Sequence, residues 1–345
     1  MSQPMTITSS YAANALHGGR IQAARRAFPS APEPFVDLST GINPVPYPLP
    51  SIPIDAFARL PEPESLDTLL AAAAQAYDVA STDMVVAAPG TQILINLLPL
   101  LFRATTVAVL SPTYNEHAAC WRAGGAQVHE ASDLADIGRA EIVVLCNPNN
   151  PDGRRYDRGA VQGLLAHQAA HDGWVVIDEA FADLEDAALG AASLLPHPRL
   201  LILRSFGKTY GLAGVRLGFL LAAAAHAERV RQALGPWAVS GPAITVGAAA
   251  LQDSAWRART RRHLADSTSR LDALLTQAGL RIIGGTHLFR LAEHPDAPAL
   301  YRALGQAGIL VRPFSDHPSW LRFGLPGHPT AWDRLADVLK AISER

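Results

Sequence analysis

The sequence predicts an α/β protein with a large domain built on a mainly parallel sheet and a small α+β domain. Two features predict this. Short apolar runs rich in β-branched residues alternate with helical segments through the middle of the chain, as in sheets covered by helices on both faces. After about residue 235 the pattern changes to a long helix, three strands and a closing helix, which indicates a second unit.

The elements of the large domain follow in a regular order. Residues 65–79 and 91–102 predict helices, the second bent near Pro99 because proline lacks the helical N–H donor. Buried strands are predicted at residues 106–110, 141–146, 174–178 and 199–205. A helix near residues 157–171 is one of the segments that connect them. Parallel neighbours need such crossover connections, so the alternation favours a parallel sheet.

The ends of the chain have a different character. The first stretch of about sixty residues is rich in proline (PSAPEPF and NPVPYPLPSIP) and predicts an extended arm. Beyond a hinge near GPWAVSGP, strands are expected at THLFRL, ILVRPF and WLRFGL. We therefore expect an N-terminal arm at 1–50 that forms part of the small domain, a large domain at 51–235 and a C-terminal small domain at 236–345.

Composition argues against several classes of function. The 345-residue chain is 49% hydrophobic, enough for a large core, and its formal net charge of -2 creates no field that would attract nucleic acid or an anionic membrane. Cys120 and Cys146 form no CxxC pair, no signal-peptide pattern is visible, and the longest apolar stretch covers about half a bilayer. We expect a soluble, cytoplasmic protein whose partner is a small molecule.

The segment RSFGKTYGLAGVRLGF, residues 204–219, carries the strongest chemical signal. Ser205 precedes Lys208 by three residues, Arg216 follows it by eight, and glycines lie between them. Such a grouping can hold an amine beside a dianionic phosphate, as an enzyme that binds pyridoxal phosphate covalently must do. The plain alternative is a strand-to-helix turn with a surface lysine.

Further candidates lie at the expected ends of strands, where open α/β sheets bind ligands. Gly90, Thr91 and Gln92 begin a helix and can offer backbone amides to a phosphate, although many helices begin this way without function. Tyr114 could stack on a flat heteroaromatic ligand or simply pack at the sheet edge. Asp178 ends a buried strand and needs a partner, which a pyridinium nitrogen would supply, unless it caps a helix.

In their order and spacing these motifs resemble the fold-type I pyridoxal-phosphate enzymes of the class I/II aminotransferase group, over nearly the whole chain. The resemblance implies that Lys208 bonds covalently to pyridoxal 5′-phosphate, that Asn150 of NPNNPDG contacts its phenolic oxygen and that Asp178 contacts its ring nitrogen. The other residues expected to hold the cofactor are Gly90, Thr91, Gln92, Tyr114, Ser205 and Arg216. No metal site is expected.

Three features resemble a subfamily of this group that decarboxylates L-threonine O-3-phosphate. They are HGG at residues 17–19, LSTGINP at 38–44, and Phe181 in DEAF, where the aminotransferases usually have a tyrosine. The expected product is (R)-1-amino-2-propanol O-2-phosphate, a cobalamin precursor. The resemblance implies that substrate contacts come from His17, Gly18, Asn43, Asn150, Arg312 and Arg322. Which arginine binds the carboxylate and which the phosphate stays open.

Two alternatives share part of this pattern. A histidinol-phosphate or related aminotransferase would use the same cofactor residues, and only the HGG arm and Phe181 favour the decarboxylase. The sensor half of a transcription regulator would also bind the cofactor, but such proteins usually carry a DNA-binding domain where this chain has a proline-rich arm. The resemblance further implies a homodimer.

Overall fold

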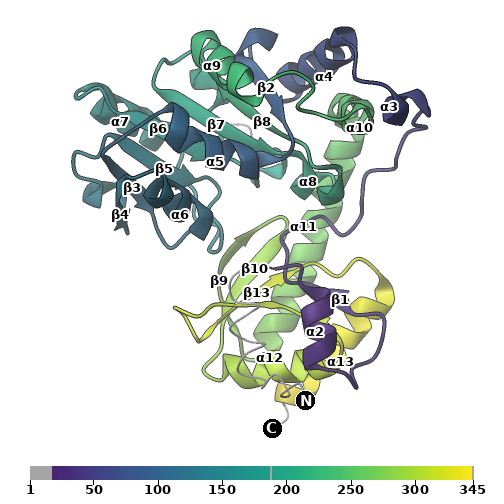
Figure 1. Cartoon of the computed structure of the whole chain (residues 1–345). Coiled ribbons are helices and arrows are strands. Elements are labelled where there is room, and N and C mark those ends of the chain that lie inside the picture. Colours follow the sequence, from purple (N-terminus) through teal and green to yellow (C-terminus); the bar gives the residue numbers. More distant parts are fainter. Residues whose placement is uncertain (1–17, 187–188, 344–345) are drawn as a thin grey trace, which may run out of the picture. The chain divides into compact units, whose positions relative to one another are not determined.

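The computed structural model describes residues 18–186 and 189–343 (Figure 1). The chain forms two compact units, a large unit of Pro46–Arg259 and a small unit of Met1–Val45 with Thr260–Arg345. The sequence-based boundaries were placed after residues 50 and 235. In the structure the second division lies farther along, within a long helix, α11 (Ser254–Gln277).

The large unit is built on a seven-stranded sheet of order β2-β8-β7-β6-β5-β3-β4 (Figure 1). Its strands are β2 Val85–Ala88, β3 Thr106–Leu110, β4 Gln127–Ala131, β5 Ile142–Cys146, β6 Trp174–Asp178, β7 Leu200–Ser205 and β8 Gly218–Ala222. Strand β8 pairs antiparallel with both neighbours, and every other pairing is parallel. The predicted mainly parallel sheet is therefore confirmed, with β2, β4 and β8 added to the four expected strands.

Two apolar cores cover the two faces of this sheet because successive strand residues point to opposite sides. Val143 and Ile177 belong to the core formed with α4, α7 and α10, whereas Val144 and Val176 belong to the core formed with α5, α6 and α9. The helices of the large unit are α3 Asp55–Ala58, α4 Pro63–Ala76, α5 Thr91–Leu101, α6 Asn115–Ala123, α7 Arg158–Ala169, α8 Phe206–Thr209, α9 Ala224–Leu234 and α10 Gly241–Gln252. Short 3-10 turns lie at Thr82–Met84, Leu134–Asp136, Ala182–Leu184, Ala192–Leu194 and Ala213–Val215.

The small unit packs helices on a four-stranded antiparallel sheet of order β12-β13-β10-β9. Its strands are β9 Arg281–Thr286, β10 Phe289–Glu293, β12 Arg312–Pro313 and β13 Trp320–Gly324, and its helices are α2 Ile21–Ala27, α12 Ala297–Gln306 and α13 Pro329–Ser343. A two-residue strand of the arm, β1 (Val36–Asp37), pairs parallel with β11 (Ile309–Leu310).

The N-terminal arm is less extended than its proline content predicts. Residues 21–27 form α2, and residues 55–58 form a single helical turn, α3. Both helices are too short for a periodic apolar pattern to be visible, and tertiary packing stabilises such pieces more than propensity does. Within the described residues, no helix combines the length and apolarity that a membrane crossing requires.

Candidate functional site

Four strands of the large unit end at one edge of the sheet. Four predicted cofactor residues lie at or just after these ends, namely Gly90, Asn150, Asp178 and Ser205. Cys146 and Asp178 are direct neighbours where β5 and β6 end, and Ser205 ends β7 beside them. Strand β2 runs in the same direction as β7, since both are antiparallel to β8, so the turn at Gly90 lies at the same edge. The fold thus brings together residues that are far apart in the sequence.

The start of α5 has the features of an anion site. Gly90 adopts φ 85° and precedes the first helical residue, Thr91, and a Cβ at Gly90 would lie 2.5 Å from Arg216 Nη2. Gly218 packs equally closely against the start of α5, because a Cβ at this position would lie 2.6 Å from the Thr91 nitrogen. A guanidinium therefore lies over a helix N-terminus, where unpaired amides and the helix dipole favour negative charge.

One amide at this helix start already has a partner, and the roles of Gly90, Thr91 and Gln92 in cofactor binding stay predictions. The Gly90 N–H donates to the Ala88 carbonyl at 2.7 Å, so it is occupied by the turn itself. The first helical amides, of Thr91 and Gln92, remain as candidate phosphate donors. Gln92 has a second role that the sequence did not reveal, because its Oε1 accepts from the Tyr114 hydroxyl at 2.9 Å. This bond orients the predicted stacking ring.

Lys208 lies in α8, directly after β7, where the strand delivers Ser205. The Lys208 Nζ is 5.7 Å from the centroid of the Phe181 ring. The DEAF segment and the lysine peptide therefore meet, as the sequence motifs imply. Asn150 is buried in the loop that follows β5, and Asn149 fixes this loop by donating to the Pro112 carbonyl and to Asp152.

A buried histidine that sequence reasoning missed contacts Asp178. His117 Nε2 lies 2.9 Å from Asp178 Oδ2, and Asp178 Oδ1 accepts from the Ala180 N–H at 3.0 Å. Burial alone would lower the pKa of His117, but Cys146 and Asp178 beside its ring raise this pKa to about 10. His117 stands on α6 one turn after Tyr114, and that spacing was the only available signal.

The pairing of His117 with Asp178 makes the stability of the folded state depend on pH, because it changes the pKa of His117. Its folded pKa lies above the usual value near 6.5, so the stabilisation by the charged ring is complete below about pH 6.5 and is lost as the pH rises through about 10. The ion pair with Asp178 therefore persists at neutral pH. His117, Cys146 and Asp178 also offer one nitrogen, one sulfur and one oxygen within 4.8 Å of one another, a set that zinc accepts. Metal independence stays a prediction.

A second missed cluster lies behind the ends of β6 and β7. Arg204 Nη1 donates to Asp183 Oδ1 at 3.0 Å, and Arg204 Nε lies 3.2 Å from Glu179 Oε2 without hydrogen-bond alignment. Burial raises the pKa of both carboxyl groups, while the charge of Arg204 acts in the opposite direction. Because Glu179 follows Asp178 and Arg204 precedes Ser205, this cluster ties together the two segments that carry cofactor residues.

The small unit contains two buried arginines that lie opposite each other on neighbouring strands. Arg312 on β12 and Arg322 on β13 are cross-strand partners, 7% and 3% exposed. Burial and the neighbouring charge of Arg312 lower the pKa of Arg322 well below its usual value, and Asp37 partly opposes this. Like charges placed opposite each other in a sheet are unfavourable, and buried cations need counter-charge. The pair is thus suited to an anion.

The remaining predicted residues belong to the small unit. Asn43 is buried, and its Oδ1 accepts from the Val45 N–H at 3.0 Å, which closes a turn in LSTGINP. Gly18 packs against Ser39, whose carbonyl oxygen would lie 2.3 Å from a Cβ at that glycine. His17 lies outside the described residues. The substrate roles of these residues stay predictions.

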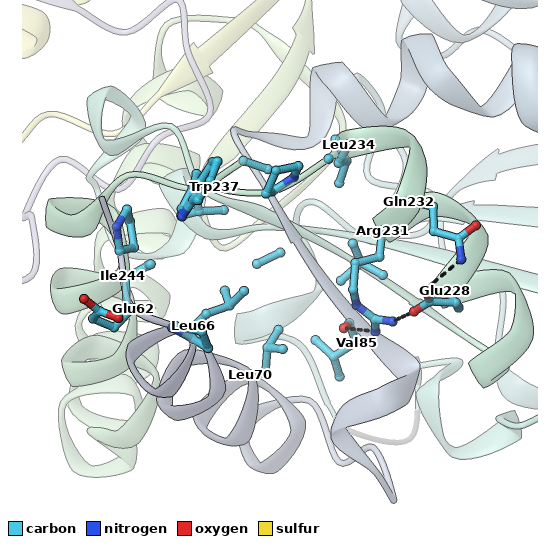
Figure 2. A pocket seen from close by; sticks show the side chains of 18 residues that line it. Glu62, Leu66, Leu70, Val85, Glu228, Arg231, Gln232, Leu234, Trp237 and Ile244 are labelled. Atoms are coloured by element: carbon cyan, nitrogen blue, oxygen red, sulfur yellow. Dashed lines mark hydrogen bonds and ion pairs between the residues drawn. The ribbon is translucent and has the colours of Figure 1, made fainter. Parts of the chain in front are cut away.

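An apolar pocket lies away from the Lys208 segment, beside the edge strand β2 (Figure 2). It has a volume of about 550 Å³ and is lined from α4, β2, α9 and α10, with Trp237 at one side. Arg231 crosses it, bonded to Glu228 and to the Val85 carbonyl. Among the described residues, none of those predicted to bind cofactor or substrate lines this pocket.

Comparison with known proteins gives a consistent result. The family model for aminotransferase class I and II matches residues 53–339. A threonine-phosphate decarboxylase from Sinorhizobium sp is 42% identical, over 94% of this chain and 97% of that protein. One from Pseudomonas aeruginosa is 39% identical, over 95% and 98%. Histidinol-phosphate aminotransferase 2 of Pseudomonas aeruginosa is 31% identical, over 72% of each chain.

Solved structures share the fold at lower identity. Histidinol-phosphate aminotransferase from Sinorhizobium meliloti, in complex with pyridoxal-5′-phosphate, superposes with a TM-score of 0.77 at 22% identity, covering 94% of each chain. L-threonine-O-3-phosphate decarboxylase from Porphyromonas gingivalis gives 0.74 at 21% identity, over 90% of this chain and 100% of that one. The predicted fold-type I architecture is confirmed.

Replacing Arg204 with methionine tests the buried cluster behind the strand ends. Arg204→Met leaves two buried carboxyl groups without their cation, so we expect the free energy of unfolding to fall by about 3–5 kcal/mol. Urea unfolding measures this. The matched control is Arg122→Met, which breaks an exposed pair with Glu130 and should cost less than about 1 kcal/mol. Equal losses in the two variants would contradict a structural role for the cluster.

Proposed function

Because the chain belongs to the class I and II aminotransferase family, we propose that it is a pyridoxal-phosphate enzyme that decarboxylates L-threonine O-3-phosphate. The products would be carbon dioxide and (R)-1-amino-2-propanol O-2-phosphate. Two relatives that match nearly the whole chain are named for this decarboxylation, and the histidinol-phosphate aminotransferase matches less of the chain at lower identity.

The opposed arginines carry this proposal structurally. L-Threonine O-3-phosphate presents a carboxylate and a phosphate, so two buried guanidinium groups can each take one anion. Histidinol phosphate has a phosphate and no carboxylate, so it offers the two arginines one anion in place of two. However, 2-oxoglutarate, the other substrate of that rival reaction, has two carboxylates. The reaction therefore has to be measured directly.

The residues of the large unit fit pyridoxal 5′-phosphate. The cradle at Gly90, which Arg216 overlies, suits the phosphate, and Asp178 can hold a proton on the ring nitrogen. Tyr114 is oriented by Gln92 for stacking. When bound, the cofactor supplies an aromatic ring that accepts the electron pair of the broken Cα bond. Lys208 supplies the amine that bonds to it and can afterwards return a proton to Cα.

Bond choice then depends on how the substrate is oriented. The bond that breaks must stand perpendicular to the cofactor ring, since only then does its electron pair overlap the ring. We propose that Arg312 and Arg322, by anchoring the two anions, set the Cα–carboxylate bond in that position. Phe181 places an apolar ring beside Lys208, at a position where a tyrosine would supply a hydroxyl.

The two reactions are separated by incubating the purified protein, with cofactor, with each substrate. With L-threonine O-3-phosphate we expect carbon dioxide and the amino alcohol phosphate, identified by mass spectrometry. With histidinol phosphate and 2-oxoglutarate we expect at most about 1% of that rate to appear as glutamate, a difference of about 2.7 kcal/mol in activation free energy. Glutamate without carbon dioxide would overturn the proposed reaction.

Gly90→Ala tests the phosphate cradle. The new methyl group would lie 2.5 Å from Arg216 Nη2 on a backbone with positive φ, so we expect cofactor affinity to fall at least about tenfold. Titration of apoprotein with pyridoxal 5′-phosphate, followed by absorbance, measures this. Gly138→Ala is the control, since it has φ 61° and open space around it. If both variants bound the cofactor like the parent, Gly90 and Arg216 would not form the cradle.

We also propose that the protein is a cytoplasmic homodimer whose second copy covers the apolar surface around the pocket of Figure 2. Trp237, which lines the pocket, is exposed, and so are Leu49, Ile54, Phe57 and Leu60 in the segment that leads to the pocket residue Pro61. Helix α3 packs tightly on the start of α10, because a Cβ at Gly241 would lie 2.2 Å from the Ala56 carbonyl oxygen. Helix α3 is thus attached to a helix that lines the pocket, and monomers rarely leave large apolar patches uncovered.

Phe57→Glu tests this surface. A buried carboxylate at the subunit contact would be strongly unfavourable, so we expect light scattering to report a mass near the 36.7 kDa of one chain in place of twice that value. Leu100→Glu is the control, because Leu100 is 61% exposed on α5, outside the surface described above. A dimer that survives Phe57→Glu would place the interface elsewhere.

A further inference from the structure

We propose that Ser39 is a positioning residue that joins the turn at Gly18 and Gly19 to Arg322, and so holds one arginine of the pair in a fixed orientation for an anion. The identity of that anion as part of L-threonine O-3-phosphate rests on the function proposed above. The positioning role does not, since it follows from contacts within the small unit.

Ser39 uses each of its polar groups in a buried position. Its N–H and its hydroxyl both donate to Asp37 Oδ1, at 2.9 and 2.6 Å. The hydroxyl also accepts from the Gly19 N–H at 2.7 Å, and the carbonyl accepts from Arg322 Nη2 at 2.9 Å. With only 1% of Ser39 exposed, water cannot replace these bonds. One residue therefore links an acid, a turn and a guanidinium.

Close packing explains why glycines surround this residue. A Cβ at Gly18 would lie 2.3 Å from the Ser39 carbonyl oxygen, the same oxygen that holds Arg322. On the other side, a Cβ at Gly324 would lie 2.4 Å from the Thr40 carbonyl oxygen, and the Gly324 N–H donates to the Leu38 carbonyl at 2.6 Å. The segment around Ser39 is thus enclosed between the N-terminal turn and the end of β13.

The guanidinium of Arg322 is held from two directions. Its carbon lies 5.0 Å from the centroid of the Phe289 ring, and one of its nitrogens donates to the Ser39 carbonyl. A planar guanidinium that stacks on a ring and donates one hydrogen bond has a fixed orientation, so the directions of its other N–H donors are fixed as well. Asp37 adds negative charge that favours the protonated form of Arg322 and anchors Ser39 as well.

The hydroxyl and the carbonyl of Ser39 have different roles. The Ser39 hydroxyl fixes the Gly19 amide, and Gly18 packs against the Ser39 carbonyl that bonds Arg322. The Ser39 carbonyl fixes Arg322 itself. Losing the hydroxyl should loosen the turn and the anion contact together, while the cofactor residues of the large unit are untouched. Ser39 would therefore affect substrate affinity more than the chemical step.

The test compares Ser39→Ala with Ser319→Ala in the holoenzyme. Ser319 also donates a hydroxyl hydrogen bond in the small unit, to Glu293 Oε1, but lies outside this network. For Ser39→Ala we expect KM for L-threonine O-3-phosphate to rise about tenfold, with kcat within about twofold and unchanged cofactor absorbance. Calorimetric affinity for inorganic phosphate should fall by the same factor, and the Gly19 amide should exchange faster with solvent deuterium.

A second variant disturbs the contact between the Ser39 carbonyl and Arg322 by steric hindrance. Gly18→Ala would push a methyl group against the Ser39 carbonyl, so phosphate binding should weaken as in Ser39→Ala. If Ser39→Ala and Ser319→Ala bound phosphate equally and protected Gly19 equally, the proposal would be wrong. Loss of cofactor absorbance in Ser39→Ala would also overturn it, in favour of general destabilisation. If the parent protein releases no carbon dioxide, the proposed function fails, yet phosphate binding and exchange still decide the role of Ser39.

Discussion

The site of the large unit depends on the shared direction of strands β2, β5, β6 and β7. Because these strands end at one edge of the sheet, a glycine turn, an acid and a lysine peptide from distant parts of the sequence meet there. The sheet is buried on both faces, and packing against the two apolar cores therefore fixes the positions of its strand ends.

Buried charge is the second recurring theme, and the chain handles it in two ways. In the large unit, Asp178 and Arg204 each have partners of opposite charge within the protein, His117 for the acid and two carboxyl groups for the arginine. In the small unit, Arg312 and Arg322 face each other across β12 and β13, and Asp37 partly opposes the lowering of the pKa of Arg322. The paired charges of the large unit stabilise its structure, whereas two guanidinium groups on neighbouring strands suit an anionic ligand.

The sequence predicted the parts of this molecule that follow from local patterns. Runs such as TVAVL and WVVID became β3 and β6, because buried parallel strands need continuous apolar residues. Strand β4 (QVHEA) was missed because it is largely exposed and polar. The Lys208 peptide could be recognised because Ser205, Lys208 and Arg216 lie close together in the sequence, and their roles stay predictions.

Features that depend on tertiary register could not be read from the sequence. The opposition of Arg312 and Arg322 requires the pairing of β12 with β13, and the pairing of His117 with Asp178 joins residues 61 positions apart. Ser39 shows the same limit: its bond to Arg322 spans 283 positions, and LSTGINP alone gives no sign of it. Local motifs indicate which chemistry is present, and long-range packing decides which side chains orient it.

Borohydride reduction of the holoprotein, followed by peptide mass spectrometry, tests the covalent chemistry most directly. Reduction converts a lysine bonded to the cofactor into a stable pyridoxyl-lysine. The modification should appear in one peptide only, on Lys208. A reduced protein with no modified peptide, or one modified at Lys340 instead, would contradict the assignment of the site to the strand ends of the large unit.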